Sequence, residues 1–367
     1  MNDKPWIGSN PVGVRWDAEI IPGPVHETLD DAVDKWPDRP AIEFMERRLK
    51  HRELGDFANC SALGLHWLGV KPDVHVRLYL PDTPHYPIAS FGVLKASGAG
   101  LNYSPLDAAK VLEHKIEDSR TDLLLTLNLA PLYPRLAAML GKTRLKKLIV
   151  GSRAEMTAAL DVVSAEVRTG RQLSKVGSDD HHVNFANLPG NDGAFEEHPI
   201  ADVRQAIAVG QYTGATTGLS KGAMLTHANP MSASGQHRET AGGTPPVLVE
   251  GQERMLAVLP PLHIYALIVN LLFGLLIGLL IGAEIILHVR FVPKATLDDI
   301  SRKRVSALRR ANYIHRAHHS SRTNHRPTEC RETTGVMLVS SMEMTDRTDH
   351  VRRRGRKEPS PACQRRA

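Results

Sequence analysis

Cysteine is scarce in this chain of 367 residues, and its three copies, Cys60, Cys330 and Cys363, lie far apart. An odd number of widely separated cysteines indicates neither a disulfide framework nor a zinc cluster. The N-terminal sequence MNDKPWIGSN also lacks the basic start and the apolar core of a secretory signal. These absences favour a protein of the reducing cytoplasm over an exported one.

Most of the chain carries no excess of positive charge. The formal net charge is +6, but residues 306–367 hold 14 Lys and Arg against six Asp and Glu, so the residues before them are slightly acidic. This basic region lacks the interleaved aromatic side chains and the reading motifs of sequence-specific nucleic-acid-binding proteins. It predicts at most a nonspecific, salt-sensitive contact with nucleic acid.

Hydrophobic residues make up 42% of the chain, which fits a globular protein with two or three domains and a substantial core. Apolar periodicity predicts helices that alternate with short strands. This alternation is typical of parallel β-α-β units, whose helices cover a twisted sheet, so the predicted fold class is α/β. The expected helices are 25–36, 53–68, 86–96, 108–118 and 132–140, and the expected strands are 41–44, 74–80, 99–103, 123–127, 147–150 and 206–209.

A loop rich in glycine and hydroxyl residues follows the last of these strands. Glycine lets the backbone approach a ligand closely, so that successive N–H groups point at an anion, while hydroxyls and a lysine add donors suited to phosphate. The loop is not a Walker A loop, because Gly214 and Gly218 enclose three residues and that motif needs four. The loop predicts a polyphosphate site. Its candidate ligands are Thr213, Gly214, Thr216, Thr217, Gly218, Ser220 and Lys221.

The segment Tyr212–Gly222 resembles the phosphate-loop signature of the AMP-forming acyl-CoA ligases. Two further segments, Thr226–Asn229 (THAN) and Leu259–Leu267 (LPPLHIYAL), resemble later blocks of that family in the same order. The resemblance is greatest to bacterial fatty-acid and dicarboxylate CoA ligases, and it ends near Leu308. It implies that residues 1–308 form part of the N-terminal AMP-binding domain of the adenylate-forming ligase fold, with parallel sheets flanked by helices.

This resemblance implies ATP, CoA and magnesium as cofactors, and a medium-chain, long-chain or dicarboxylic acid as substrate. In the family, a carboxylate attacks the α-phosphate of ATP to give an acyl-adenylate and pyrophosphate, and the thiol of CoA then displaces AMP. The loop residues would hold the β and γ phosphates. His263 and Tyr265 would line the acyl or adenylate pocket, and His227 would brace the region below the loop. From the residues alone, each of these three also fits a purely structural core position.

Departures from the family pattern are as informative as the matches. Ala215 stands where the family usually has a second glycine, which costs about 1 kcal/mol if that position needs a positive φ. Nothing after Leu308 resembles the Tyr-Gly-x-Thr-Glu stretch that holds adenylate and magnesium, the ribose-binding Asp, or the C-terminal domain with its catalytic Lys. Residues 309–367 have no apolar period apart from a short strand-like run at 336–339, which predicts a disordered tail. We therefore expect a truncated ligase with weak or no activity, and assign no catalytic residue.

Two other features allow a different interpretation. The apolar run Ile264–Leu287 is long enough to span a membrane, and anchoring there is the alternative function, with peripheral membrane contact as a milder form. Asn270 and Glu284 would be costly in lipid, so a buried helix followed by a strand at 284–289 is favoured. The adjacent His181 and His182 lack metal-site spacing and are expected in a solvated loop.

Overall fold

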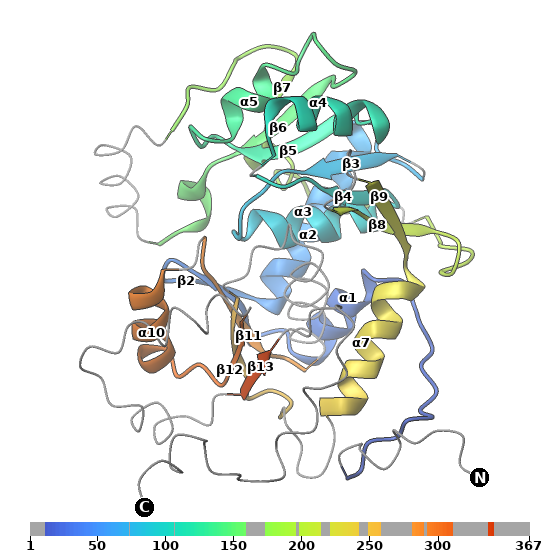
Figure 1. The fold of residues 1–367 in the computed structure, drawn as a ribbon, viewed down its shortest axis with the longest axis vertical. Coiled ribbons are helices and arrows are strands. Elements are labelled where there is room, and N and C mark those ends of the chain that lie inside the picture. The colour runs from blue at the N-terminus through green and yellow to red at the C-terminus, as the bar shows by residue number, and fades with distance from the viewer. Residues whose placement is uncertain are drawn as a thin grey trace, which may run out of the picture.

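The computed structural model is described over residues 12–72, 74–105, 107–158, 173–195, 198–213, 221–241, 249–257, 281–289, 292–310 and 337–340. Two sheets lie one above the other with helices between and around them (Figure 1). The expected α/β class is confirmed, because both sheets consist mainly of parallel strands and carry helices on their faces.

The upper sheet in Figure 1 has seven strands in the order β7-β6-β5-β3-β4-β8-β9. Neighbouring strands are parallel, except that β8 and β9 form an antiparallel hairpin. All five residues of β5 are buried, as expected of a parallel strand that helices cover on both faces. The strands are β3 (His75–Leu78), β4 (Ala99–Asn102), β5 (Leu123–Leu127), β6 (Lys147–Gly151), β7 (His182–Asn184), β8 (Ile207–Thr213) and β9 (Lys221–Thr226).

The lower sheet has six strands in the order β13-β12-β10-β11-β1-β2. Only the β1–β2 hairpin is antiparallel among these pairs. Met45 and Glu46 form its turn with φ angles of 47° and 67°, which are left-handed values. The strands are β1 (Pro40–Phe44), β2 (Arg47–Lys50), β10 (Arg254–Ala257), β11 (Glu284–Leu287), β12 (Ala307–Arg310) and β13 (Met337–Ser340).

The helices form layers around the two sheets. Helices α2 and α3 lie between the sheets, where α2 contacts β1 and β2, and α3 contacts β3 and β4 (Figure 1). These two helices pack closely because Gly92 faces Ser61, whose Cβ would lie 2.8 Å from an added methyl group. The helices are α1 (Glu27–Lys35), α2 (His51–Trp67), α3 (His85–Lys95), α4 (Ala109–Asp118), α5 (Tyr133–Ala137), α7 (Ala228–Ala241) and α10 (Pro293–Arg302).

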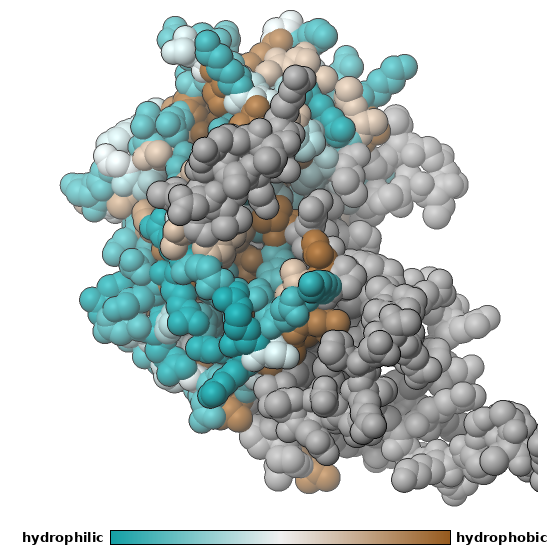
Figure 2. Space-filling view, turned by 90° about the vertical axis from the view of Figure 1, so that its left-hand side faces the viewer, coloured by the Kyte–Doolittle hydropathy of each residue, from teal (hydrophilic) through white to brown (hydrophobic). Residues whose placement is uncertain are grey.

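Hydrogen bonds join the two halves where the β1–β2 turn meets the upper half. Arg47 Nη1 donates to the carbonyl of Glu155 at 2.6 Å, and Thr157 Oγ1 donates to the carbonyl of Met45 at 3.2 Å. On the face drawn in Figure 2, the coloured part of the lower half is mostly hydrophilic, and hydrophobic residues show in the upper half as well as midway down.

Several sequence predictions need correction. The strand expected at 206–209 continues to Thr213, and the helix expected at 132–140 ends at Ala137. His182 was expected in a solvated loop, but it lies in edge strand β7 and binds Tyr133 and Asp179. Strands β2, β7, β9 and β10 and helix α7 were not predicted.

The interpretation of the apolar run 264–287 concerns a segment that mostly falls outside the described residues. Its C-terminal part is strand β11 (Glu284–Leu287), as predicted. Within the described part of the chain, no helix combines the length and the apolar character needed to cross a membrane.

Candidate nucleotide-binding site

The β8–β9 hairpin carries the loop that the sequence singles out. Its register pairs Ile207 with Thr226 at one end and Thr213 with Lys221 at the other. Because β8 is parallel to β4, the loop leaves β8 at the carboxyl edge of the sheet, where ligands of such sheets usually bind. We call the Thr213–Lys221 end the tip of the hairpin and the Ile207–Thr226 end its base.

The predicted phosphate ligands divide into two groups. The backbone of Thr213 ends β8, and Lys221 begins β9 with an exposed side chain, so the structure places these two opposite each other across the hairpin. The remaining loop ligands, Gly214, Thr216, Thr217, Gly218 and Ser220, lie outside the described residues, as do the predicted pocket residues His263 and Tyr265. Their roles remain predictions.

Near the tip, Tyr212 is buried, with 7% of its surface exposed. Its hydroxyl donates to Oδ2 of Asp118, the last residue of α4, at 2.5 Å. The ring meets Tyr103 edge-on at 6.0 Å between centroids, and the ammonium of Lys115 lies 4.9 Å from its centre. Burial, followed by the hydrogen bond to Asp118, raises the pKa of Tyr212 above its ordinary value, so its phenol keeps its proton.

At the base, His227 follows β9 and is 3% exposed. Its Nδ1 accepts the backbone N–H of Val25 at 2.9 Å, which joins the hairpin to the segment before α1. Burial, with a smaller contribution from the charge of His26, lowers the pKa of His227 to about 4. The ring of His26 lies edge-on at 6.1 Å between centroids. His227 is therefore neutral near pH 7, with Nδ1 as acceptor and the proton on Nε2.

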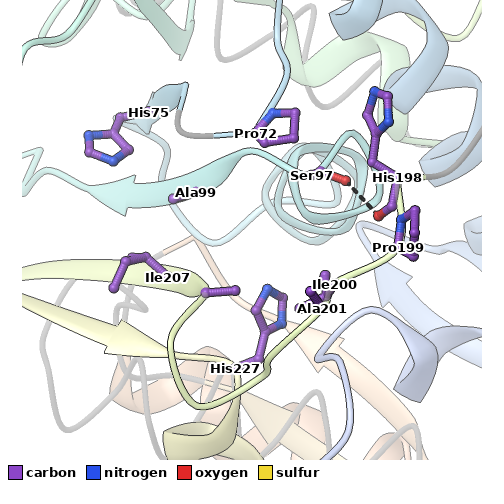
Figure 3. A pocket seen from close by; sticks show the side chains of 11 residues that line it. Pro72, His75, Ser97, Ala99, His198, Pro199, Ile200, Ala201, Ile207 and His227 are labelled. Atoms are coloured by element: carbon purple, nitrogen blue, oxygen red, sulfur yellow. Dashed lines mark hydrogen bonds between the residues drawn. The ribbon is translucent and has the colours of Figure 1, made fainter.

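A cavity of about 210 Å³ opens beside His227, at the amino ends of β3, β4 and β8. Figure 3 shows the imidazole pointing into it between Ile207 and Ile200, while Ser97 Oγ donates to the carbonyl of His198 at 3.1 Å along its rim. This cavity lies at the opposite end of β8 from the loop. It is therefore separate from the predicted phosphate site, and His227 belongs to the hairpin base.

A family model described as "AMP-binding enzyme" matches residues 29–346, which include both ends of this hairpin. The chain belongs to the AMP-binding enzyme family. Among the relatives of this AMP-binding protein is the long-chain-fatty-acid–CoA ligase of Escherichia coli O6:H1, which is 30% identical over 276 residues, covering 73% of this chain and 48% of the ligase.

Solved structures share the fold of this AMP-binding chain. The long-chain-fatty-acid-CoA ligase of Archaeoglobus fulgidus superposes with a TM-score of 0.67 at 19% identity, covering 86% of this chain and 57% of that one. ATP-bound MatB of Rhodopseudomonas palustris also gives 0.67, at 18% identity, covering 87% and 55%. The chain spans about half the length of the curated ligases that it matches.

Sequence reasoning about this AMP-binding protein named His227 as a brace below the loop, but it found neither the partner of His227 nor the support at the tip. Tyr212 was seen only as the start of a motif, and its partner Asp118 lies 94 positions earlier. Val25, the partner of His227, lies 202 positions away. In the sequence, the only signal for the tip support was a tyrosine directly before the loop.

Proposed function

We propose that this chain binds ATP through the loop at the tip of the β8–β9 hairpin and serves the adenylation step of an acyl-CoA ligase. In that step the carboxylate of a fatty or dicarboxylic acid attacks the α-phosphate of ATP, which gives an acyl-adenylate and releases pyrophosphate. In the second step of the ligase reaction, the thiol of CoA takes the acyl group and displaces AMP. The observation that carries the proposal is the family match over residues 29–346, which includes the loop.

The geometry of the tip supports a role in holding phosphate. Lys221 is exposed where the hairpin returns to the sheet, which places a positive charge at the carboxyl edge. In phosphoryl chemistry, proteins contribute mainly by positioning the phosphates and neutralising their charge. Lys221 supplies the charge, and the backbone of the glycine-rich loop supplies N–H donors.

The names of the relatives, which give long-chain fatty acids, support a fatty acid as the substrate. Magnesium accompanies ATP in the family. However, the described residues contain no group of three or more His, Cys, Asp or Glu side chains that could hold a metal ion.

Two measurements test the proposal: equilibrium binding of ATP, and acid-dependent exchange of pyrophosphate into ATP across mono- and dicarboxylic acids of several lengths. Lys221→Ala should weaken ATP binding about 10- to 100-fold, because a hydrogen bond to a charged group contributes about 1.5–3 kcal/mol. Exchange that depends on one chain length would identify the acid.

Lys142→Ala is the matched control, since Lys142 is also exposed but lies between α5 and β6, toward the opposite edge of the sheet. It should leave ATP binding unchanged. Absence of ATP binding by the unaltered chain, or equal effects of the two lysine variants, would contradict the proposed role of the loop.

A further inference from the structure

The residue directly before the end of β8 occupies an unusual position. Tyr212 lies one residue before Thr213, the last described residue ahead of the loop. Across the hairpin it pairs with Gly222, where an added Cβ would lie 3.4 Å from the phenol Cζ. The ring is thus fitted against the second strand as well as against Tyr103, and its orientation is set from both sides.

The partner of the Tyr212 hydroxyl belongs to a helix turn that is itself fixed to the sheet. Asp118 ends α4, and the next residue, Ser119, accepts a hydrogen bond from Nε of the buried Arg77 at 2.9 Å. Tyr103 adds a second attachment, because its hydroxyl donates to the carbonyl of Lys115 at 2.8 Å. The last turn of α4 is therefore a fixed point to which a loop stem can be tied.

The hydroxyl of Tyr212 is not needed for the packing of its ring. A phenylalanine would fill the same space against Tyr103 and Gly222, because the ring provides all of that contact. Asp118 is exposed, so it has no need of the phenol to satisfy its carboxylate. What the 2.5 Å bond adds is a direct link between the hairpin and α4.

We propose that Tyr212 is a positioning residue, whose hydrogen bond to Asp118 fixes the first residue of the phosphate loop relative to helix α4. This inference rests on the proposed role of the loop in binding ATP. The bond holds the end of β8 at the point where the loop begins, so that ATP binding would have less of this stem to order. Pre-ordering of this kind raises affinity by lowering the entropy that binding must remove.

Backbone hydrogen exchange over residues 213–221 of the full chain tests the idea directly. Tyr212→Phe and Asp118→Ala should each accelerate exchange in this segment about three- to tenfold, the range expected for one hydrogen bond. The double variant should exchange no faster than Tyr212→Phe, because that variant already removes the bond to Asp118 together with the interaction of the hydroxyl with Ser119. Asp118→Asn keeps a carbonyl acceptor and should restore most of the protection.

Tyr133→Phe is the matched control. It also removes a buried phenol hydroxyl, which lies 2.9 Å from His182 Nε2, but at the opposite edge of the sheet. Exchange at 213–221 should not change in this variant. Unchanged exchange in Tyr212→Phe, additive effects in the double variant, or an equal effect of Tyr133→Phe would overturn the inference.

ATP affinity, measured on the same variants, separates this inference from the proposed function. Affinity should fall by about the same three- to tenfold factor as protection is lost. If the unaltered chain binds no ATP while exchange follows the expected pattern, the positioning role stands and the proposed function fails. If ATP binds equally well to the unaltered chain and to Tyr212→Phe, the proposed function stands and the positioning role fails.

Discussion

The two ends of the β8–β9 hairpin are held in different ways. At the base, a buried imidazole that lines a cavity accepts a backbone N–H from a segment 202 positions away, and no charge is involved near pH 7. At the tip, a buried ring reaches out to an exposed carboxylate on a helix end. The base is bonded inside the protein, whereas the tip is bonded at its surface.

This difference assigns separate tasks to the two ends. A buried N–H that loses its acceptor is left without a hydrogen bond. The bond between Val25 and His227 therefore contributes mainly to the free energy of unfolding. An exposed carboxylate that loses its donor is rehydrated, so the tip bond contributes little to that free energy. The tip bond instead contributes to the geometry of the loop beside it.

The largest effect is expected at the base. His227→Ala should lower the free energy of unfolding by roughly 3–5 kcal/mol, since it opens a cavity and leaves the N–H of Val25 without its acceptor. Urea denaturation would measure this change. His227→Asn is the comparison, because its side-chain oxygen can still accept a hydrogen bond. Equal losses in the two variants would mean that the Val25 bond contributes little.

Acid should also lower the free energy of unfolding through His227, at the base of the hairpin. The pKa of His227 is lowered from 6.5 to about 4 in the folded protein, so the folded state resists a proton that the unfolded state accepts. The contribution of His227 is complete above pH 6.5, falls as the pH drops toward 4, and is constant below that. Its full size is on the order of 3 kcal/mol.

Denaturation at several pH values would reveal this dependence as a slope that is smaller in His227→Asn. Other groups also make the protein less stable in acid, and Asp299 is one of them. Burial acts to raise its pKa, but hydrogen bonds from Arg302, Lys303 and His288 lower it to about 2. That change lies mostly below pH 4. Burial also lowers the pKa of His51, so this second imidazole adds its own slope below pH 6.5. A slope between pH 4 and 6.5 that is unchanged in His227→Asn would contradict the assignment to His227.

The sequence predicted the central strands well, because their apolar runs are continuous and bounded. The strand expected at 123–127 coincides with β5, since parallel packing buries every residue of LLLTL. Strand β9 was missed because KGAMLT begins exposed and is only partly buried at an edge of the sheet, so it shows no clear alternation. Helix α7 (ANPMSASGQHRETA) lacks an apolar stripe of helical period.

The loop of the candidate site could be predicted from the sequence, but the hydrogen bonds that hold it could not. A glycine-rich loop after a strand is a local pattern, so Thr213 and Lys221 could be placed at a turn from the sequence alone. The bonds that hold this turn join residues 94 and 202 positions apart, and no local pattern reports such pairs. The resemblance to a ligase family located the loop and named His227 as a brace below it, but it gave neither the partner Val25 nor the bond between Tyr212 and Asp118.

The smallest stability effect is expected at the tip, and it decides whether the comparison holds. Tyr212→Phe should lower the free energy of unfolding by no more than about 1 kcal/mol, because the ring stays buried and Asp118 is hydrated when the hydroxyl is gone. Urea denaturation beside His227→Ala would measure the contrast. A loss similar to that at the base would mean that the Tyr212 bond is part of the stabilising core. The link to α4 would then act on ATP binding only through the stability of the whole fold.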